Sequence, residues 1–255
     1  MQLFLTFAFL FYLGSTIGWV LELFFRRFVS AKKWINPGFL TGPYLPLYGF
    51  GLCLLFLLAH VDFPMIGNIV VRKGLQILLM GIAMTAIEYI AGKIFIVGMK
   101  VKLWDYSDRW GNIEGIICPQ FSLYWTLLGA FYLFVIHPYM MSAVSWLFGN
   151  LAFSFVIGFF FGVFCIDFAC SVKLLTRLRR FAKEQNIVVR LEEFKNNIAD
   201  RLKQATGKVR FRHFFFAFRG NTNLFDQLKS YREELAARKE KETETPEKTE
   251  KQEKN

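Results

Sequence analysis

Residues 143–170 read AVSWLFGNLAFSFVIGFFFGVFCIDFAC, and they form the longest apolar stretch of the sequence. Asp167, near the end of the stretch, is its only charged residue. A helix that crosses the hydrocarbon core of a bilayer needs about 20 predominantly apolar residues. This stretch is long enough to cross a membrane. We therefore expect an integral membrane protein that has the lipid bilayer as a partner.

Four more apolar stretches precede this one, and they lie near residues 3–25, 44–61, 74–98 and 116–136. The second is short, and the third is long enough only if it includes Glu88 and Lys93. Hydrophobic residues make up 54% of the chain, which is more than a soluble domain requires. We predict an all-α fold, a polytopic bundle of about five transmembrane helices in residues 1–172 with a cytoplasmic helical tail.

The charge of the chain changes near residue 173. Residues 1–172 carry 10 Lys or Arg against 7 Asp or Glu, whereas residues 173–219 carry 13 against 4. We predict a domain boundary here, then a basic amphipathic helical region (173–235) and a disordered charged tail (236–255). The helical prediction rests on an apolar stripe at helical spacing, formed by Ile187, Leu191, Phe194, Ile198 and Leu202.

The segment from Arg210 to Arg219 mixes cations with aromatic side chains. Such a segment can dock on anionic lipid or stack on the bases of a nucleic acid. Because this one is tethered beside a bilayer, we favour contact with anionic lipid and expect no nucleic-acid partner.

Positive charge predicts the orientation of the helices, because short cytoplasmic loops retain Lys and Arg. The loops after the first and third apolar stretches carry the cations Arg26, Arg27, Lys32, Lys33, Lys100, Lys102 and Arg109. The loop after the second stretch carries only Arg72 and Lys73, and the loop after the fourth carries none. We therefore predict a multi-pass protein of the bacterial inner membrane, with its N-terminus outside and its C-terminus in the cytoplasm.

Two loops of the sequence resemble each other. Residues 36–48 read NPGFLTGPYLPLY, and they align without gaps to residues 112–124, which read NIEGIICPQFSLY. Coincidence in membrane sequence is one explanation, and a duplicated pair of helices is the other. A duplication would give parallel repeats with both loops on one face of the membrane. It would also set Pro43 and Pro119 in the first turn of the following helices, where a missing N–H has no cost.

Each repeat contains a glutamate before its loop, Glu22 or Glu88. At helical spacing Glu22 shares a face with Ser15 and Gly18, and Glu88 shares one with Gly81, Thr85 and Gly92. Small residues permit close helix approach, so both carboxyls are expected to point into the bundle.

Two interpretations of these glutamates stay open. In the structural one, Glu22 pairs with Arg26, and Glu88 pairs with Lys93 or a loop backbone. In the functional one, a polar cavity joins Glu22, Asn36, Glu88, Asp105 and Asn112.

Several short motifs recur in a fixed order over roughly residues 5–165. They are Gly18-Trp19-Val-Leu-Glu22, Asn36-Pro-Gly-Phe-Leu-Thr-Gly-Pro43, Pro46-Leu-Tyr48-Gly-Phe-Gly51, Glu88-Tyr-Ile-Ala-Gly92, Trp104-Asp-Tyr-Ser107 and Asn112-Ile-Glu-Gly115. In these motifs the chain resembles the Putative ABC-transporter type IV family of CmpB-like bacterial membrane proteins. It departs from the family pattern at Pro37 and Ile96, where the family usually carries Arg and often carries a second acid. Motif-loop residues singled out by the resemblance are Gly38, Pro43, Pro46, Tyr48, Trp104, Tyr106 and Ser107.

The resemblance implies a transport component of the permease type. The sequence contains no Gly-x-x-x-x-Gly-Lys-Ser/Thr segment, so we expect any ATPase to be a separate subunit. The alternative is a membrane scaffold or regulator whose basic tail recruits a partner or anionic lipid.

An enzyme is the least favoured class, because no pairing of nucleophile and base is visible. We predict no catalytic residue, cofactor or metal site. The four cysteines lie singly in apolar stretches, and the three histidines are far apart in the sequence.

Overall fold

The structure is a computed structural model of the 255-residue chain. It describes residues 1–30, 32, 34–185, 187–197, 229–231 and 233. The chain divides into two compact units, Met1–Leu191 and Glu192–Asn255. The predicted stripe residues Ile198 and Leu202, the segment 210–219 and the tail 236–255 lie outside the described residues.

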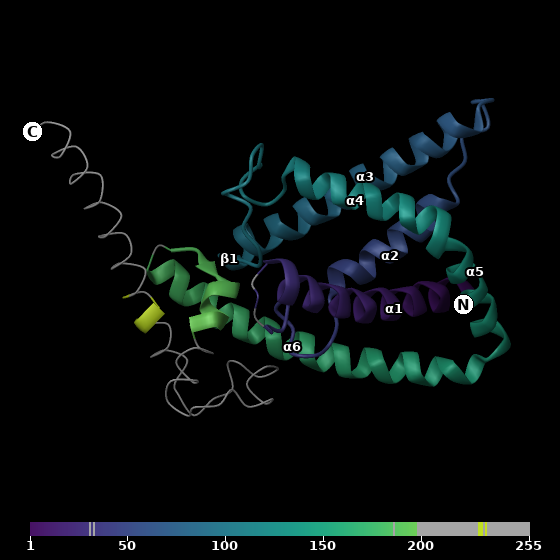
Figure 1. Ribbon diagram of the computed structural model, residues 1–255. Coiled ribbons are helices and arrows are strands. Elements are labelled where there is room, and N and C mark those ends of the chain that lie inside the picture. Colours follow the sequence, from purple (N-terminus) through teal and green to yellow (C-terminus); the bar gives the residue numbers. More distant parts are fainter. Residues whose placement is uncertain (31, 33, 186, 198–228, 232, 234–255) are drawn as a thin grey trace, which may run out of the picture. The chain divides into compact units, whose positions relative to one another are not determined.

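Helices make up most of the first unit (Figure 1). In chain order its elements are α1 (Gln2–Phe25), η1 (Arg26–Ser30), α2 (Pro46–Ala59), α3 (Ile69–Lys93), η2 (Ile94–Met99), β1 (Val101–Lys102), α4 (Pro119–Phe131), η3 (Tyr132–Ile136), α5 (His137–Gly149), η4 (Leu151–Phe153), α6 (Ser154–Glu184) and β2 (Val189–Arg190). The first three η elements are π-helical, and η4 is a 3-10 turn. The predicted helical bundle is confirmed, with one addition: β1 and β2 form a short parallel pair.

Within the described residues, four helical segments are long and apolar enough to cross a membrane: Gln2–Val29, Ile69–Met99, Pro119–Gly149 and Leu151–Glu184. The remaining apolar helix, α2, has 14 residues. At about 1.5 Å per residue it reaches only part of the way across a hydrocarbon core of about 30 Å. The chain is therefore a membrane protein, and its described part contains four long apolar segments and one short apolar helix.

The predicted third helix, 74–98, begins too late. It starts at Ile69, because Asn68 caps it by accepting the backbone N–H of Val70 at 2.9 Å. Arg72 and Lys73, predicted to lie in a loop, are therefore in the first turns of α3. Hydropathy misses this boundary because the capping hydrogen bond is local and independent of apolar content.

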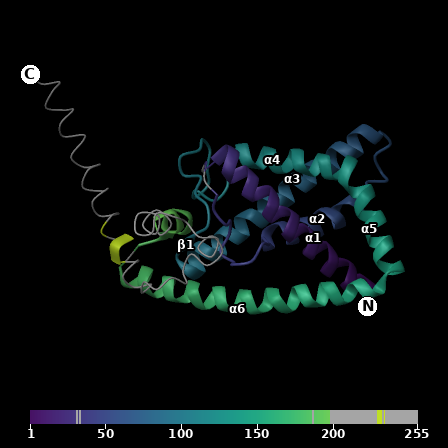
Figure 2. The same cartoon turned by 60° about the horizontal axis from the view of Figure 1, so that its bottom comes forward.

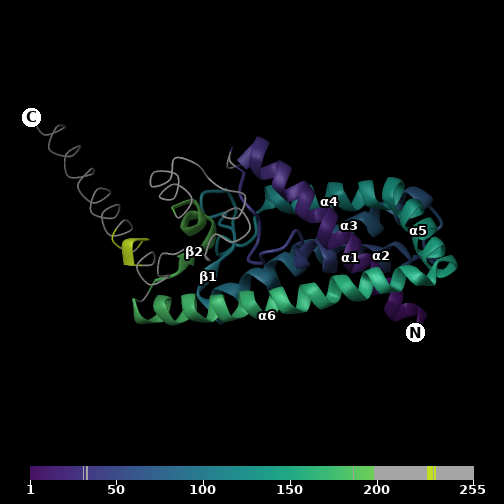
Figure 3. The same ribbon diagram turned by 90° about the horizontal axis from the view of Figure 1, so that it is seen from below.

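The predicted boundary between the fourth and fifth helices is also wrong. Residues 137–149, which include the expected loop, are helical, and the break falls at Asn150 instead. Figures 1, 2 and 3 show α5 bending away from α4. A π-helical turn (η3) and Pro138 lie at the bend, and both are common causes of helix kinks.

The change in polarity at residue 173 lies inside α6 and does not end it. The helix continues to Glu184, and the first compact unit ends at Leu191. The change in composition shows that the two parts of α6 differ in polarity. It does not end the helix, because the backbone hydrogen bonds continue past residue 173. In the second unit, Phe194 and Tyr231 are buried, and their rings pack edge to face with centroids 5.4 Å apart.

The helices of the first unit alternate in direction. α1, α3 and α6 run toward one end of the bundle, and α2 and α4 run away from it (Figures 1 and 3). The first motif loop (residues 34–45) and the second motif loop (residues 103–118) therefore both lie at that end, which we call the motif end. Phe39 of the first loop contacts Phe95 of η2, with ring centroids 4.8 Å apart. The two loops thus lie at the same end of the helices, as loops on one face of a membrane would.

Glycines bring the helices of each pair together. A Cβ at Gly14 of α1 would lie 2.7 Å from Leu52 Cβ of α2, and one at Gly18 would overlap Tyr48. In the second pair, a Cβ at Gly81 of α3 would overlap Thr126 of α4. Helices with such faces pack at short range through van der Waals contact.

Candidate functional site

Glu22 lies near the end of α1 with two polar partners. The Tyr48 hydroxyl donates to its Oε2 at 2.9 Å, and Arg26 Nε donates to its Oε1 at 3.0 Å. The predicted pairing of Glu22 with Arg26 is confirmed. The pair is internal to α1, since the residues are four apart, and Tyr48 adds a contact from α2.

Glu88 of α3 is more deeply buried, with 3% of its surface exposed. Trp125 Nε1 donates to its Oε2 at 2.9 Å, and the Tyr106 hydroxyl donates to its Oε1 at 3.1 Å. Of the two partners considered for Glu88, Lys93 is wrong, because Lys93 Nζ lies 2.8 Å from Glu114 Oε2. Among the described residues no cation forms an ion pair with Glu88.

The two glutamates are connected through aromatic rings. Tyr48 and Trp125 contact each other with ring centroids 5.8 Å apart, and each donates to one glutamate. The chain Glu22–Tyr48–Trp125–Glu88 therefore joins the first helix pair to the second. In each pair an aromatic donor on the second helix binds the carboxylate of the first helix.

This equivalence is not the one that the sequence repeat predicts. The alignment pairs Tyr48 with Tyr124, but Tyr124 is 46% exposed and Trp125 binds Glu88 instead. The expectation that Pro43 begins a helix is also wrong, because α2 begins at Pro46, whereas α4 begins at Pro119 as predicted. Since the two helices begin at different points of the repeat, aligned residues lie on different helical turns.

Asn36 organises the first motif loop. Its Oδ1 accepts Trp19 Nε1 at 2.7 Å, and its Nδ2 donates to the carbonyl oxygens of Leu40 and Thr41 at 3.3 and 2.9 Å. Gly38, inside this turn, has φ +75°, a conformation that glycine adopts without strain. The buried Asn36 side chain thus fixes both the loop and its attachment to α1.

Asp167 of α6 holds the same loop from the other side. It accepts the backbone N–H of Gly42 at 2.8 Å, the Tyr44 hydroxyl at 2.7 Å and the Ser171 hydroxyl at 3.1 Å. The backbone N–H of Thr41 also points at this carboxylate. The sequence marks Asp167 only as the single charged residue of its apolar stretch and does not indicate its role. The available signal was a serine one turn away, which can help to satisfy a carboxylate in an apolar helix.

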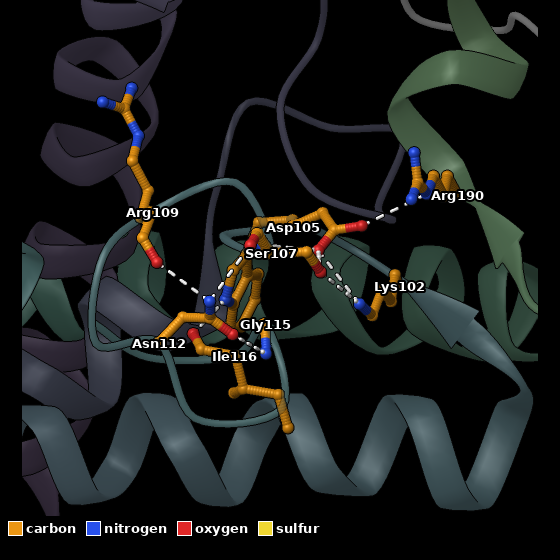
Figure 4. Close-up of polar contacts among 9 residues, drawn as sticks. Lys102, Asp105, Ser107, Arg109, Asn112, Gly115, Ile116 and Arg190 are labelled. Atoms are coloured by element: carbon orange, nitrogen blue, oxygen red, sulfur yellow. Dashed lines mark hydrogen bonds and ion pairs between the residues drawn. The ribbon is translucent and has the colours of Figure 1, made fainter. Parts of the chain in front are cut away.

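Asp105 is the centre of the second motif loop (Figure 4). Lys102 Nζ lies 2.9 Å from its Oδ1, Ser107 donates to the same oxygen, and Arg190 Nε lies 3.1 Å from its Oδ2. Burial acts to raise the pKa of Asp105, but the hydrogen bonds from Ser107 and Lys102 outweigh it and lower the pKa below its usual value. Through Arg190 this carboxylate connects the loop to β2.

Asn112 closes the same loop (Figure 4). Its Nδ2 donates to the carbonyl oxygens of Ser107 and Arg109 at 3.0 and 2.8 Å, and its Oδ1 accepts the N–H of Gly115 at 3.0 Å. Gly115 has φ +68°, and a Cβ there would lie 2.7 Å from Asp105 Oδ1. Trp104 Nε1 donates to the Ile116 carbonyl at 2.8 Å, which ties the start of the loop to its end.

Tyr106 connects the second motif loop to the buried Glu88. Its ring stacks on Phe121 with centroids 4.3 Å apart, and its hydroxyl donates to Glu88. Burial and the nearby Glu88 carboxylate raise the pKa of Tyr106 well above its usual value. The hydroxyl therefore stays protonated and can donate a hydrogen bond to Glu88. The five predicted site residues thus form three groups: Glu22 with Glu88, Asn36 with the first loop, and Asp105 with Asn112.

Other parts of the first unit offer less chemistry. His60 and His137, distant in sequence, have ring centroids 5.2 Å apart, and the Tyr132 hydroxyl lies 3.2 Å from His137 Nδ1. In the part of the chain that the structure describes, no group of three His, Cys, Asp or Glu residues is arranged to hold a metal ion. The four cysteines are free thiols.

These features define a class, a polytopic helical membrane protein with a hydrogen-bonded acidic core and two ordered loops at one end. Residues 9–172 match the model of the family described as Putative ABC-transporter type IV, and the chain belongs to this family. No curated protein and no solved structure gave a match. The family and the apolar helices together support a membrane protein related to transport.

Proposed function

We propose that the protein is a permease-like subunit of a membrane transport system whose ATPase is a separate chain. The observation that carries the proposal is the chain of contacts Glu22–Tyr48–Trp125–Glu88, whose two glutamates lie in helical segments long and apolar enough to cross a membrane. Ionisable groups in such helices are costly, and they commonly mark a pathway for a substrate or ion. The family membership of residues 9–172 supports the same function.

Charge supports an orientation for this subunit. The motif end carries Arg26, Arg27, Lys100, Lys102 and Arg109, and the C-terminal half of α6 adds more cations. At the opposite end, Arg72 and Lys73 are the cations nearest the loop between α2 and α3. By the positive-inside rule the motif end faces the cytoplasm of a bacterial inner membrane and the N-terminus faces outward.

The test is to identify stoichiometric partners after cross-linking in the membrane and purification in a mild detergent. We expect an ATPase to co-purify, and ATP hydrolysis by the complex to fall in Glu88→Gln at unchanged protein level. Glu114→Gln, which removes the same charge from an exposed position of the second motif loop, is the matched control. Purification of the protein without any ATPase, under cross-linking that retains other partners, would contradict the proposal.

A scaffold or regulatory role is the second candidate, and one observation favours it. The segment that precedes the tail is coupled to the second motif loop through the β1–β2 pair and the contact of Arg190 with Asp105. Truncation after Leu191, where the first compact unit ends, distinguishes the two roles. A scaffold acting through its tail loses its partners on truncation, whereas a permease-like subunit retains its ATPase.

A further inference from the structure

A cavity lies between the two helix pairs of the first unit. Its walls come from α1, α2, α3, α4, η3 and α5, and its lining is almost entirely apolar. Leu55 and Met84 close its inner side, with 4% and 2% of their surfaces exposed. The most exposed lining residues are Ile17 and Leu21 of α1, at 50% and 53%. The mouth therefore opens along α1, on a face that lies in the membrane.

Three aromatic rings line this cavity, those of Tyr48, Trp125 and Tyr132. Tyr48 and Trp125 are lining residues of this almost entirely apolar cavity, and their polar atoms bind Glu22 and Glu88, which are not among the lining residues. The face of an aromatic ring attracts cations, and it does so best where water is excluded. The cavity is thus apolar but has a wall that favours positive charge.

The carboxylates strengthen this preference. A hydroxyl or N–H that donates to a carboxylate leaves its ring richer in electrons, so the faces of Tyr48 and Trp125 become more negative. Arg26 balances Glu22, but no described cation forms an ion pair with Glu88. Both oxygens of Glu88 accept hydrogen bonds, from Tyr106 and Trp125, and hydrogen bonds of this kind favour the ionised form of a carboxyl group. In a medium of low dielectric, a negative charge on Glu88 strongly attracts a cation that lies on the other side of one aromatic ring.

We propose that the cavity between the helix pairs binds a lipophilic organic cation, with its charged group against Tyr48 and Trp125 and its apolar part toward Ile17 and Leu21. As a statement about substrate class this rests on the proposed transport function, whereas the binding itself does not. The geometry suits a quaternary ammonium or similar delocalised cation that enters from the membrane. A neutral lipid chain fits the apolar wall but gains nothing from Glu88.

The experiment measures binding of phenyltrimethylammonium to the full chain in an uncharged maltoside detergent. Its neutral isostere, tert-butylbenzene, has the same shape without the charge. We expect the cation to bind at least about tenfold more tightly than the isostere, a difference of one decade in Kd. Equal affinities, or a preference for the neutral compound, would overturn the proposal.

Two pairs of variants locate the binding. Glu88→Gln removes the charge but keeps both hydrogen bonds, because its amide oxygen accepts from Trp125 and its amide nitrogen donates to Tyr106. We expect it to lose about tenfold in cation affinity and to leave the isostere unaffected. Glu114→Gln, which removes an exposed carboxylate, should bind both compounds like the native chain. A native cation affinity in a folded Glu88→Gln protein would contradict the role of the charge.

Ile136→Trp adds bulk to the cavity lining, and Phe134→Trp adds an indole to the exposed face of the same π-helical turn. We expect Ile136→Trp to abolish cation binding and Phe134→Trp to retain it. Undiminished binding in both would place the cation in the detergent or elsewhere on the chain. The binding assay needs no ATPase, so its result is independent of the transport assignment. If the native protein forms a complex with an ATPase but does not bind the cation, only the proposed ligand class is refuted. Binding without any ATPase partner refutes the transport assignment alone.

Discussion

Asp167 of α6 accepts a hydrogen bond from the Tyr44 hydroxyl at 2.7 Å, and this contact joins the first motif loop to the last long helix of the first unit. The same carboxylate accepts backbone N–H groups of the loop. A carboxylate with several donors is stable in an apolar helix because its lone pairs are satisfied. The loop therefore has a fixed attachment on α6, in addition to its attachment on α1 through Asn36.

Asp167→Asn should release this attachment. The amide nitrogen cannot accept a hydrogen bond, so at least one donor of the loop loses its partner, at a cost of about 1–3 kcal/mol. We expect a lower unfolding temperature and faster proteolysis within residues 34–45. Ser171→Ala removes only one donor to Asp167 and should have a smaller effect. Equal stability of Asp167→Asn and the native protein would show that the contact is not needed.

Gly18→Ala should separate α1 from α2. The added Cβ overlaps the Tyr48 side chain, which also binds Glu22, so the helix pair must move apart. We expect a destabilisation of about 1–3 kcal/mol, typical of overpacking, measured by thermal unfolding in detergent.

Gly158→Ala in α6 is the matched control, since no atom lies within 4 Å of the new Cβ. It should be neutral or stabilising, by up to about 1 kcal/mol, because alanine favours the helix. The opposite ranking of the two variants would contradict the close approach at Gly18.

Acid should loosen the second motif loop. The pKa of Asp105 is lower in the folded protein than in the unfolded chain, where it is about 3.9. Its stabilising effect is therefore complete above the unfolded pKa, and it is lost as the pH falls through the folded pKa. Asp105→Asn should flatten the decline of the unfolding temperature in acid. Asp62→Asn, at an exposed acid of the opposite end, should leave the decline intact. An unchanged acid response in Asp105→Asn would refute the linkage.

The proposed orientation can be measured with single cysteines in a background without the four native ones. Trp110 is 87% exposed in the second motif loop, and Met65 is 98% exposed in the loop between α2 and α3. With the motif end in the cytoplasm, a membrane-impermeant thiol reagent should label Met65→Cys in intact cells. It should label Trp110→Cys only after lysis. The reverse pattern would invert the orientation.

Apolar content and the 3.6-residue period were sufficient to predict the helical bundle, because a backbone in lipid must satisfy its own hydrogen bonds. Loop similarity was sufficient to predict that the two motif loops share one end. The boundaries at Ile69 and Asn150 were not predictable in this way, since they depend on a cap and on a kinked helix. The glutamates were expected to point inward, with Lys93 or a loop backbone as the partner of Glu88, but Lys93 binds Glu114 instead.

By itself the sequence determined that the chain belongs in a membrane and which residue types line its loops, because transfer from water to lipid depends on composition. Only the tertiary structure decided the partners: Trp125 rather than Tyr124 for Glu88, Asp167 for the first loop, and Arg190 for Asp105. Such contacts join residues that are tens of positions apart in the chain. They depend on the turn at which each helix begins and on the side that it presents to its neighbour, and a shift of one residue rotates a side chain by about 100°.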